Sequence, residues 1–243
     1  MTTNFKTFIT EGINDAGILK ALFVIGLPGS GKSYTIKKIS GTISPKIVNT
    51  DIATEFMALK KGVNSSVNTW PQLRDTSKRI TQTALMNYVN SMLPLFVDGT
   101  ANDISRILHR IGILESLGYD VGIVLVRADI ETALRRAEER AKLTGREVSK
   151  DFIKKVGLYN IEDTKYLQMK VDFFKQVENN SDNVDDKFML DVFKSVQGFF
   201  NEPVKNPIGK RHIKKMQEES EKYLAPNIIP PEVLKNKIEG WYK

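Results

Sequence analysis

The chain has 243 residues, of which 41% are hydrophobic and 27% are charged, and it contains two histidines and no cysteine. This length and composition suit one full core with appendages, while the lack of cysteine excludes disulfides, thiolate catalysis and cysteine zinc sites. The formal net charge of +7 favours polyanionic partners such as nucleotides or nucleic acid, and no apolar run approaches the roughly 20 residues that cross a bilayer.

Strand and helix patterns alternate along the chain, which predicts an α/β fold with a parallel sheet covered by helices on both faces. Short apolar runs predict strands at Leu19–Ile25, Lys46–Thr50, Leu93–Asp98, Val121–Arg127 and Lys187–Val192. Helical spacing predicts helices at Lys32–Ile39, Ile52–Lys60, Leu73–Ser91, Asp103–Leu117, Ile130–Leu143 and Asp151–Val177. We expect this core to occupy residues 18–200, after a leader or short helix at residues 1–17.

The most informative stretch lies between the first strand and the first helix. It reads Gly26-Leu27-Pro28-Gly29-Ser30-Gly31-Lys32-Ser33 and fits G-x-x-x-x-G-K-[ST], the phosphate-binding P-loop. Glycines permit a tight backbone whose N–H groups point inward, and the helix N-terminus adds about half a positive charge. In such a loop the lysine reaches the β- and γ-phosphates and the final hydroxyl ligates Mg²⁺. The motif therefore predicts binding of a nucleoside triphosphate with Mg²⁺, through Gly26, Pro28, Gly29, Ser30, Gly31, Lys32, Ser33 and Tyr34.

Two aspartates follow predicted strands and are expected at the same carboxyl edge of the sheet as the P-loop. Asp98 ends an apolar run, the Walker B pattern in which a carboxylate orients Mg²⁺ directly or through water. Asp51 lies on the acceptor side, where a carboxylate can take the proton of an attacking hydroxyl. Capping of the next helix is the alternative role of Asp51, but capping does not explain why Asn49 and Glu55 cluster beside it.

Arginines gather on the helix predicted at Ile130–Leu143. Arg136 and Arg140 are one turn apart and can project from one face, and Arg146 follows shortly after them. Arginines that close over a transferring phosphoryl group accelerate the reaction by factors on the order of 10³–10⁵. Pairing with glutamates of the same helix is the alternative for each arginine. We expect at least one of them to contact phosphate.

The last forty or so residues have a different composition. Residues that interrupt helices, around Pro203 and Pro207, precede the basic run Lys210–Lys215. A polar helix is predicted to continue through Tyr223. We expect residues 201–243 to form a basic helical extension wrapped on the core. A solvated charged face is the preferred interpretation of the basic run, and a contact with nucleic acid is the alternative.

Together, these segments resemble the P-loop kinases of the zeta-toxin and polynucleotide-kinase type, from about Leu22 to Tyr159. The resemblance is carried by Gly26–Ser33, Val48–Asp51, Phe96–Thr100, Leu117–Val121 and Arg135–Arg146. It implies a five-stranded parallel sheet, ATP and Mg²⁺ on the P-loop, an acceptor-side aspartate at Asp51, and a lid around residues 135–150 that carries Arg140 and Arg146. Zeta-type sequences often have glutamate at the position of Asp98 and a basic residue shortly after the Gly-Thr, so the acceptor pocket is expected to differ here.

A second resemblance concerns the N-terminus. Residues Asn4–Gly12 are similar to the leader of internal head proteins of tailed bacteriophages, which a head protease cuts after Ile/Leu-x-Glu. This resemblance implies cleavage after Glu11 and packaging of the protein in a phage head. A small amphipathic helix is the alternative.

The leading hypothesis is an ATP-dependent kinase that phosphorylates a hydroxyl of a nucleotide, a sugar nucleotide or a polynucleotide 5′ end. Its expected catalytic residues are Lys32, Asp51, Arg140 and Arg146; Ser33 and Asp98 hold Mg²⁺, Arg136 contacts the nucleotide, and Glu55, Thr100 and Arg106 face the acceptor. The alternatives are a nucleotide-switched ATPase that binds nucleic acid and a packaged head protein with an inactive kinase scaffold. We expect the protein in the cytoplasm, or in the virion if a phage encodes it, with no membrane contact.

Overall fold

The computed structural model describes residues 16–41, 43–62, 70–100, 102–144, 148–157, 161–181 and 185–224. The proposed leader with its cleavage position after Glu11 lies outside the described residues, and so does Arg146. None of the helices in the described part of the chain combines the length and apolarity needed to cross a bilayer.

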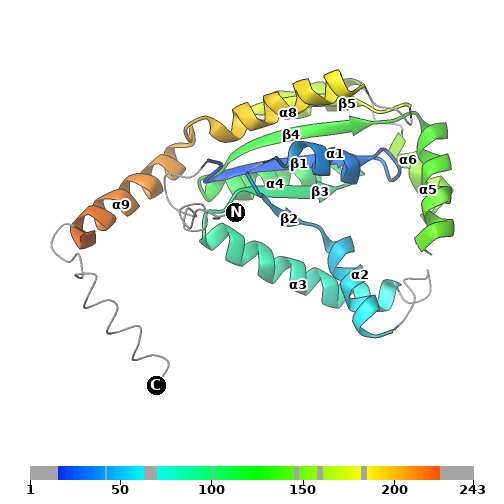
Figure 1. The fold of residues 1–243 in the computed structure, drawn as a ribbon, viewed down its shortest axis with the longest axis horizontal. Helices are drawn as coiled ribbons and strands as arrows, with labels where there is room; N and C mark the ends of the chain where they lie inside the picture. The colour runs from blue at the N-terminus through cyan, green and yellow to red at the C-terminus, as the bar shows by residue number, and fades with distance from the viewer. Residues whose placement is uncertain are drawn as a thin grey trace, which may run out of the picture.

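One sheet of five parallel strands forms the centre of the protein (Figure 1). Its strands are β1 Lys20–Gly26, β2 Lys46–Val48, β3 Leu95–Gly99, β4 Asp120–Arg127 and β5 Phe173–Glu178. They lie in the order β2-β3-β1-β4-β5, which confirms the predicted five-stranded parallel sheet. Because β1 has β3 on one side and β4 on the other, the strand order reverses at β1, and ligands of such sheets bind at the carboxyl end of that strand.

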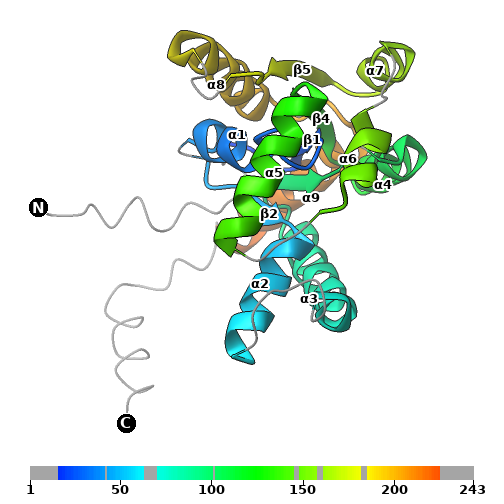
Figure 2. The same cartoon turned by 90° about the vertical axis from the view of Figure 1, so that its right-hand side faces the viewer.

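Helices cover both faces of the sheet. They are α1 Lys32–Ile39, α2 Thr50–Lys60, α3 Trp70–Asn90, α4 Ile104–Ser116, α5 Ile130–Thr144, α6 Lys150–Gly157, α7 Ile161–Gln168, α8 Asp186–Asn201 and α9 Pro207–Leu224. Figure 2 shows α1 and α8 on one side of the strands and α4 and α7 on the other. Alternate residues of β1 therefore enter separate cores: Phe23 packs in a cluster with Ile111 of α4, whereas Val24 packs with Ile36 of α1 and Val196 of α8.

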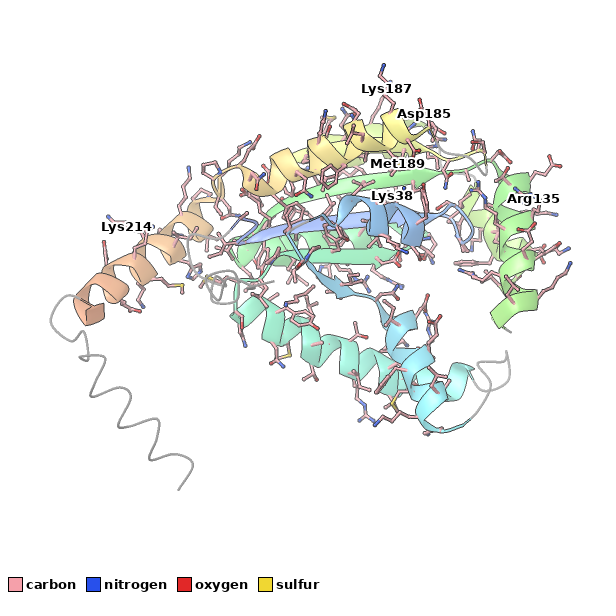
Figure 3. All side chains as sticks on the ribbon, viewed as in Figure 1. Lys38, Arg135, Asp185, Lys187, Met189 and Lys214 are labelled. Carbon is pink, nitrogen blue, oxygen red and sulfur yellow. The ribbon has the colours of Figure 1, made fainter. Side chains whose placement is uncertain are left out.

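The predicted fifth strand, Lys187–Val192, is wrong, because these residues form the start of α8. Asp185 caps this helix by accepting a hydrogen bond from the Lys187 amide at 2.9 Å. The apolar residues recur every three or four positions through α8, so they form one buried face. In Figure 3 Met189 points from α8 toward the sheet while Lys187 points away from it.

The real fifth strand, β5, lies inside the stretch that was predicted as one helix, Asp151–Val177. That stretch contains α6, α7 and then β5. Phe173 and Phe174 point to opposite faces of the sheet and join different cores, and Phe173 stacks on Phe199 of α8 with ring centroids 5.1 Å apart. Packing on both faces and pairing with β4 therefore override the helical spacing of the charged residues.

The C-terminal helix α9 is attached at the amino edge of the sheet, opposite the P-loop. Lys20 of β1 and Asp120 of β4 form an ion pair at 2.8 Å, and each side chain is only 1% exposed. The Asp120 carboxylate also accepts hydrogen bonds from the amides of Lys205 and Asn206, both at 2.7 Å. This buried network fastens the α8–α9 linker to the core. Beyond it α9 extends away from the sheet (Figure 1).

The basic run of α9 is exposed and carries ion pairs along the helix. Lys214 lies 3.7 Å from Glu218 and Lys215 lies 3.9 Å from Glu219, both at i,i+4 spacing. Such pairs are typical of a solvated helix face. They agree with the preferred interpretation of the basic run.

Candidate active site

The P-loop connects β1 to α1 and holds its glycines in conformations that favour glycine. Gly29 has a φ of +86° and Gly31, the N-cap of α1, has a φ of +93°. Both also allow close approaches: a Cβ on Gly29 would lie 2.2 Å from the Ala133 carbonyl oxygen of α5, and one on Gly31 would lie 2.1 Å from Asn179 Nδ2. Thus α5 and the loop after β5 pack closely against the P-loop and leave no room for a side chain at either glycine.

Gly29→Ala is expected to weaken ATP binding about tenfold or more, because the new methyl group meets the backbone of Ala133 in addition to the strain of a positive φ. Gly62→Ala is the matched control: Gly62 has a φ of +63°, but in the described structure no atom lies within 4 Å of a Cβ built there. Calorimetry with both variants measures the two affinities. Equal affinity of Gly29→Ala and wild type would contradict the predicted contact.

Lys32 lies over the loop that it follows. Its Nζ donates hydrogen bonds to the carbonyl oxygens of Gly26 at 3.0 Å and of Leu27 at 2.8 Å. These contacts hold the ammonium group at the carboxyl end of β1, where the motif requires it. Ser33 follows at the exposed start of α1, and the Tyr34 ring lies on the outside of this helix with Lys38 Nζ 5.5 Å from its centroid. Pro28 and Ser30 are buried.

Asn49 links the two predicted acids, through the carboxylate of Asp98 and the backbone amide of Asp51. Asn49 Nδ2 donates to Asp98 Oδ2 at 2.6 Å, and Asn49 Oδ1 accepts from the Asp51 amide at 2.7 Å. Asn49 is therefore the N-cap of α2, so the capping role considered for Asp51 is wrong. Asp51 lies in the first turn of α2, and Arg74 Nη1 of α3 lies 3.9 Å from its Oδ1. Asn49 thus links Asp51 to Asp98.

The predicted acceptor residues lie on the elements that follow these two acids. Glu55 is exposed on α2, one turn after Asp51. Thr100 follows β3, and its hydroxyl donates to Asn102 Oδ1 at 3.0 Å. Arg106 lies in the first turn of α4, where its amide and guanidinium both contact the capping residue Asp103.

The arginines of α5 have different environments. Arg135 is exposed (Figure 3) and pairs with Glu139 at 3.1 Å, as the alternative interpretation predicted for it. Arg136 donates to the carbonyl oxygens of Asn179 at 2.9 Å and Ser181 at 2.6 Å, both in the loop after β5. Two guanidinium nitrogens of Arg140, Nε and Nη2, are buried.

Helix α5 begins at a capped turn. Asp129 Oδ1 accepts from the Thr132 amide at 2.7 Å, and its Oδ2 accepts from the Thr132 hydroxyl at 3.0 Å. These hydrogen bonds lower the pKa of the Asp129 carboxyl. The turn thus keeps a negative charge at the helix N-terminus, where it is favourable.

The residues at the carboxyl edge of the sheet have the chemistry needed to bind ATP and Mg²⁺. The loop is shaped by glycines that exclude side chains from it, and Lys32 lies above it. Protein Mg²⁺ is usually held by one or two carboxylates together with phosphate oxygens and waters. Asp98, paired with Val24 in the sheet register, and Ser33 at the start of α1 supply a carboxylate and a hydroxyl near the end of β1.

Sequence reasoning missed two residues of this site, Asn49 as the link between the acids and Asn179 as a contact of the P-loop. Asn49 lay inside the predicted strand Lys46–Thr50, and its residue type, which is favoured at N-caps, was a local signal for the observed cap of α2. Asn179 had none, because it lies 149 positions from the residue that it contacts.

The fold is similar to solved structures. A protein of Chloroflexus aurantiacus J-10-fl, provisionally described as a kinase, aligns with a TM-score of 0.53 at 12% identity, over 74% of this chain and 98% of that chain. A chain of the PezAT chromosomal toxin–antitoxin system of Streptococcus pneumoniae aligns with a TM-score of 0.52 at 16% identity, over 90% of this chain and 93% of that chain. At these identities the likeness shows the fold. No curated protein sequence gives a significant match.

A family match covers most of the chain. The zeta toxin family matches residues 14–186. This span contains the five strands, the P-loop, Asp51, Asp98 and α5, and it ends where α8 begins. The resemblance carried by the sequence motifs is thereby confirmed, and the chain belongs to the zeta toxin family of P-loop kinases.

Proposed function

We propose that the protein is an ATP-dependent kinase that transfers the γ-phosphoryl group to a hydroxyl of a nucleotide, a sugar nucleotide or a polynucleotide 5′ end. The observation that carries this proposal is the Asn49 bridge, which links Asp51 and Asp98 beside the P-loop. A kinase of this kind needs an acid for the acceptor and an acid for the metal at one edge of the sheet.

The proposed roles follow the contacts. Lys32 and the loop amides hold the β- and γ-phosphates of ATP, and Ser33 and Asp98 hold Mg²⁺. When bound, Mg²⁺ neutralises charge on the phosphate oxygens. The acceptor oxygen forms a bond to the γ-phosphorus as Asp51 takes its proton, and the bond from the γ-phosphorus to the bridging oxygen breaks to release ADP.

Two contacts prepare Asp51 for this role. Its backbone is held by Asn49, and the Arg74 guanidinium lies 3.9 Å from its carboxylate, which restricts how the side chain can turn. Within the proposal, Glu55, Thr100 and Arg106 face the acceptor. Arg136 acts on the nucleotide either by direct contact or through the loop after β5, to which it donates hydrogen bonds. Arg140 and Arg146 close over the transferring group from the lid around residues 135–150. Phosphoryl transfer is mainly positioning and electrostatic stabilisation, so a few such groups account for its catalysis.

The test is a transfer assay with γ-labelled ATP against each of the three acceptor classes. Asp51→Asn keeps the shape of the side chain and removes its ability to take a proton, so we expect a fall in kcat of about 10²–10⁴-fold with little change in ATP affinity. Asp75→Asn is the matched control, because Asp75 is an exposed acid of α3 whose ion pair among the described residues is local, with Lys78 at 3.2 Å.

Full transfer by Asp51→Asn to every acceptor would contradict the role of Asp51. Label released only as inorganic phosphate, together with clear DNA binding, would instead support the alternative of a nucleotide-switched ATPase.

A further inference from the structure

Asn179, in the loop after β5, contacts the P-loop from a distant part of the chain. It is 5% exposed, and its Nδ2 donates to the Ser30 carbonyl oxygen at 2.7 Å. A carbonyl oxygen only accepts hydrogen bonds, so this contact requires the amide nitrogen of Asn179 to face the loop. The contact is also close, because a Cβ on Gly31 would lie 2.1 Å from the same nitrogen.

The contact determines the direction of one backbone donor. In a trans peptide the C=O and N–H groups point in opposite directions. Because Ser30 O is held against Asn179, the N–H of the same peptide, which belongs to Gly31, is directed away from Asn179. Phosphate-binding loops work by presenting such N–H groups to the anion.

Two buried polar atoms at this contact are unpaired. Within the described residues, neither Ser30 Oγ nor Asn179 Oδ1 has a hydrogen-bond partner, although both are shielded from solvent. Such atoms are rare in folded proteins because each one costs stability. The Asn179–Ser30 hydrogen bond therefore has a buried polar atom on each side of it.

The same loop is clamped to α5. Arg136 donates to the Asn179 and Ser181 carbonyl oxygens, and Asn180 Oδ1 accepts from the Asp129 amide at 2.8 Å. These hydrogen bonds connect α5 to Asn179 and, through Asn179, to the P-loop. Helix α5 also carries Arg140.

We propose that Asn179 is a positioning residue of the P-loop, and that Arg136, Asn179 and Ser30 form a relay that couples the position of α5 to the direction of the Gly31 N–H. The inference rests on the proposed nucleotide-binding function. It assigns Arg136 a role through protein carbonyls, whereas direct contact with the nucleotide is the alternative.

The first experiment measures ATP and ADP affinity by calorimetry for wild type, Asn179→Ala and Asn179→Asp. We expect about tenfold weaker binding for Asn179→Ala, which loses the Ser30 contact, and about a hundredfold for Asn179→Asp, whose carboxylate faces the Ser30 carbonyl and the bound anion. Asn87→Asp is the control: it adds the same charge on an exposed side chain of α3, outside the contacts between α5 and the loop after β5, so its affinity should stay near wild type.

The second experiment separates the relay from direct contact. If Arg136 acts through Asn179, Arg136→Gln weakens ATP binding in the wild-type background and has a much smaller effect in the Asn179→Ala background. A direct contact would give the same loss in both backgrounds and would overturn the relay. Arg135→Gln, on the exposed side of α5, serves as the control.

The outcomes distinguish this inference from the proposed function. No nucleotide binding by wild type would overturn the kinase. Wild-type binding together with unchanged affinity in Asn179→Ala would overturn only the role of Asn179, and so would a lowered Tm with unchanged affinity, which is the result for a purely structural residue. If Asn179→Asp does not fold, the ATP affinities of Asn179→Ala, Arg136→Gln and the double variant test the role of Asn179 in its place.

Discussion

Lys32→Ala is expected to lower the rate of phosphoryl transfer by about three powers of ten or more. The ammonium group provides a positive charge at the phosphates, and such charges act strongly in a site shielded from water. In the structure the Lys32 Nζ is already held over the loop, 3.0 Å from the Gly26 carbonyl oxygen and 2.8 Å from that of Leu27. Little reorganisation is therefore needed when a triphosphate arrives, and the loss in the variant should fall on kcat as well as on affinity.

The control for this variant is Lys37→Ala, on the same helix. Lys37 is exposed in the last turn of α1, so its removal lowers the net charge by the same amount without touching the loop. Initial rates with γ-labelled ATP and each acceptor compare the two variants. Equal rates for Lys32→Ala and Lys37→Ala would remove the P-loop from the mechanism.

Asp120→Ala is expected to lower the free energy of unfolding by about 3–5 kcal/mol, because it leaves the buried Lys20 ammonium without its counter-ion. Both side chains are 1% exposed, and the variant also removes the acceptor of the Lys205 and Asn206 amides. Urea denaturation measures the change. The network lies at the amino edge of the sheet, so the transfer rate of the folded protein should stay close to wild type.

A double variant identifies the cause of this loss. Lys20→Met/Asp120→Asn removes the buried charge and keeps an acceptor for the linker amides, so we expect it to recover most of the stability. Glu202→Gln is the control, since the Glu202–Lys205 pair is largely exposed and its removal should change stability little. A double variant as unstable as Asp120→Ala would show that the loss does not come from the unpaired lysine.

The two halves of the chain differ in how far local patterns predict them. From β1 to α5 the elements lie close to their predicted bounds, because each strand is followed by a distinct motif or a strongly periodic helix. In the second half, the strand at Phe173–Glu178 and the start of the helix at Asp186–Asn201 each contain a short apolar run within charged sequence. Such runs are ambiguous between strand and helix until the surfaces against which they pack are known.

The candidate site divides in the same way. The P-loop, Asp51 and Asp98 follow from motifs and strand ends, since a parallel sheet brings the carboxyl ends of its strands to one edge. Which atoms meet at that edge is a property of the packed structure. The Asn49 bridge joins the N-cap of α2 to Asp98 of β3. The hydrogen bonds of Arg136 to the loop after β5 join residues more than forty positions apart.

Local signals thus determined the nucleotide-binding loop, the class of fold and the acids at the sheet edge, because loop chemistry and strand–helix alternation depend on neighbours in the chain. Only tertiary packing decided which segment supplies the fifth strand, that Asn179 holds Ser30, and that Lys20 and Asp120 secure the C-terminal linker. The last two contacts join residues 100 or more positions apart. Their energies come from burial and hydrogen bonds that exist only once the sheet has brought the partners together.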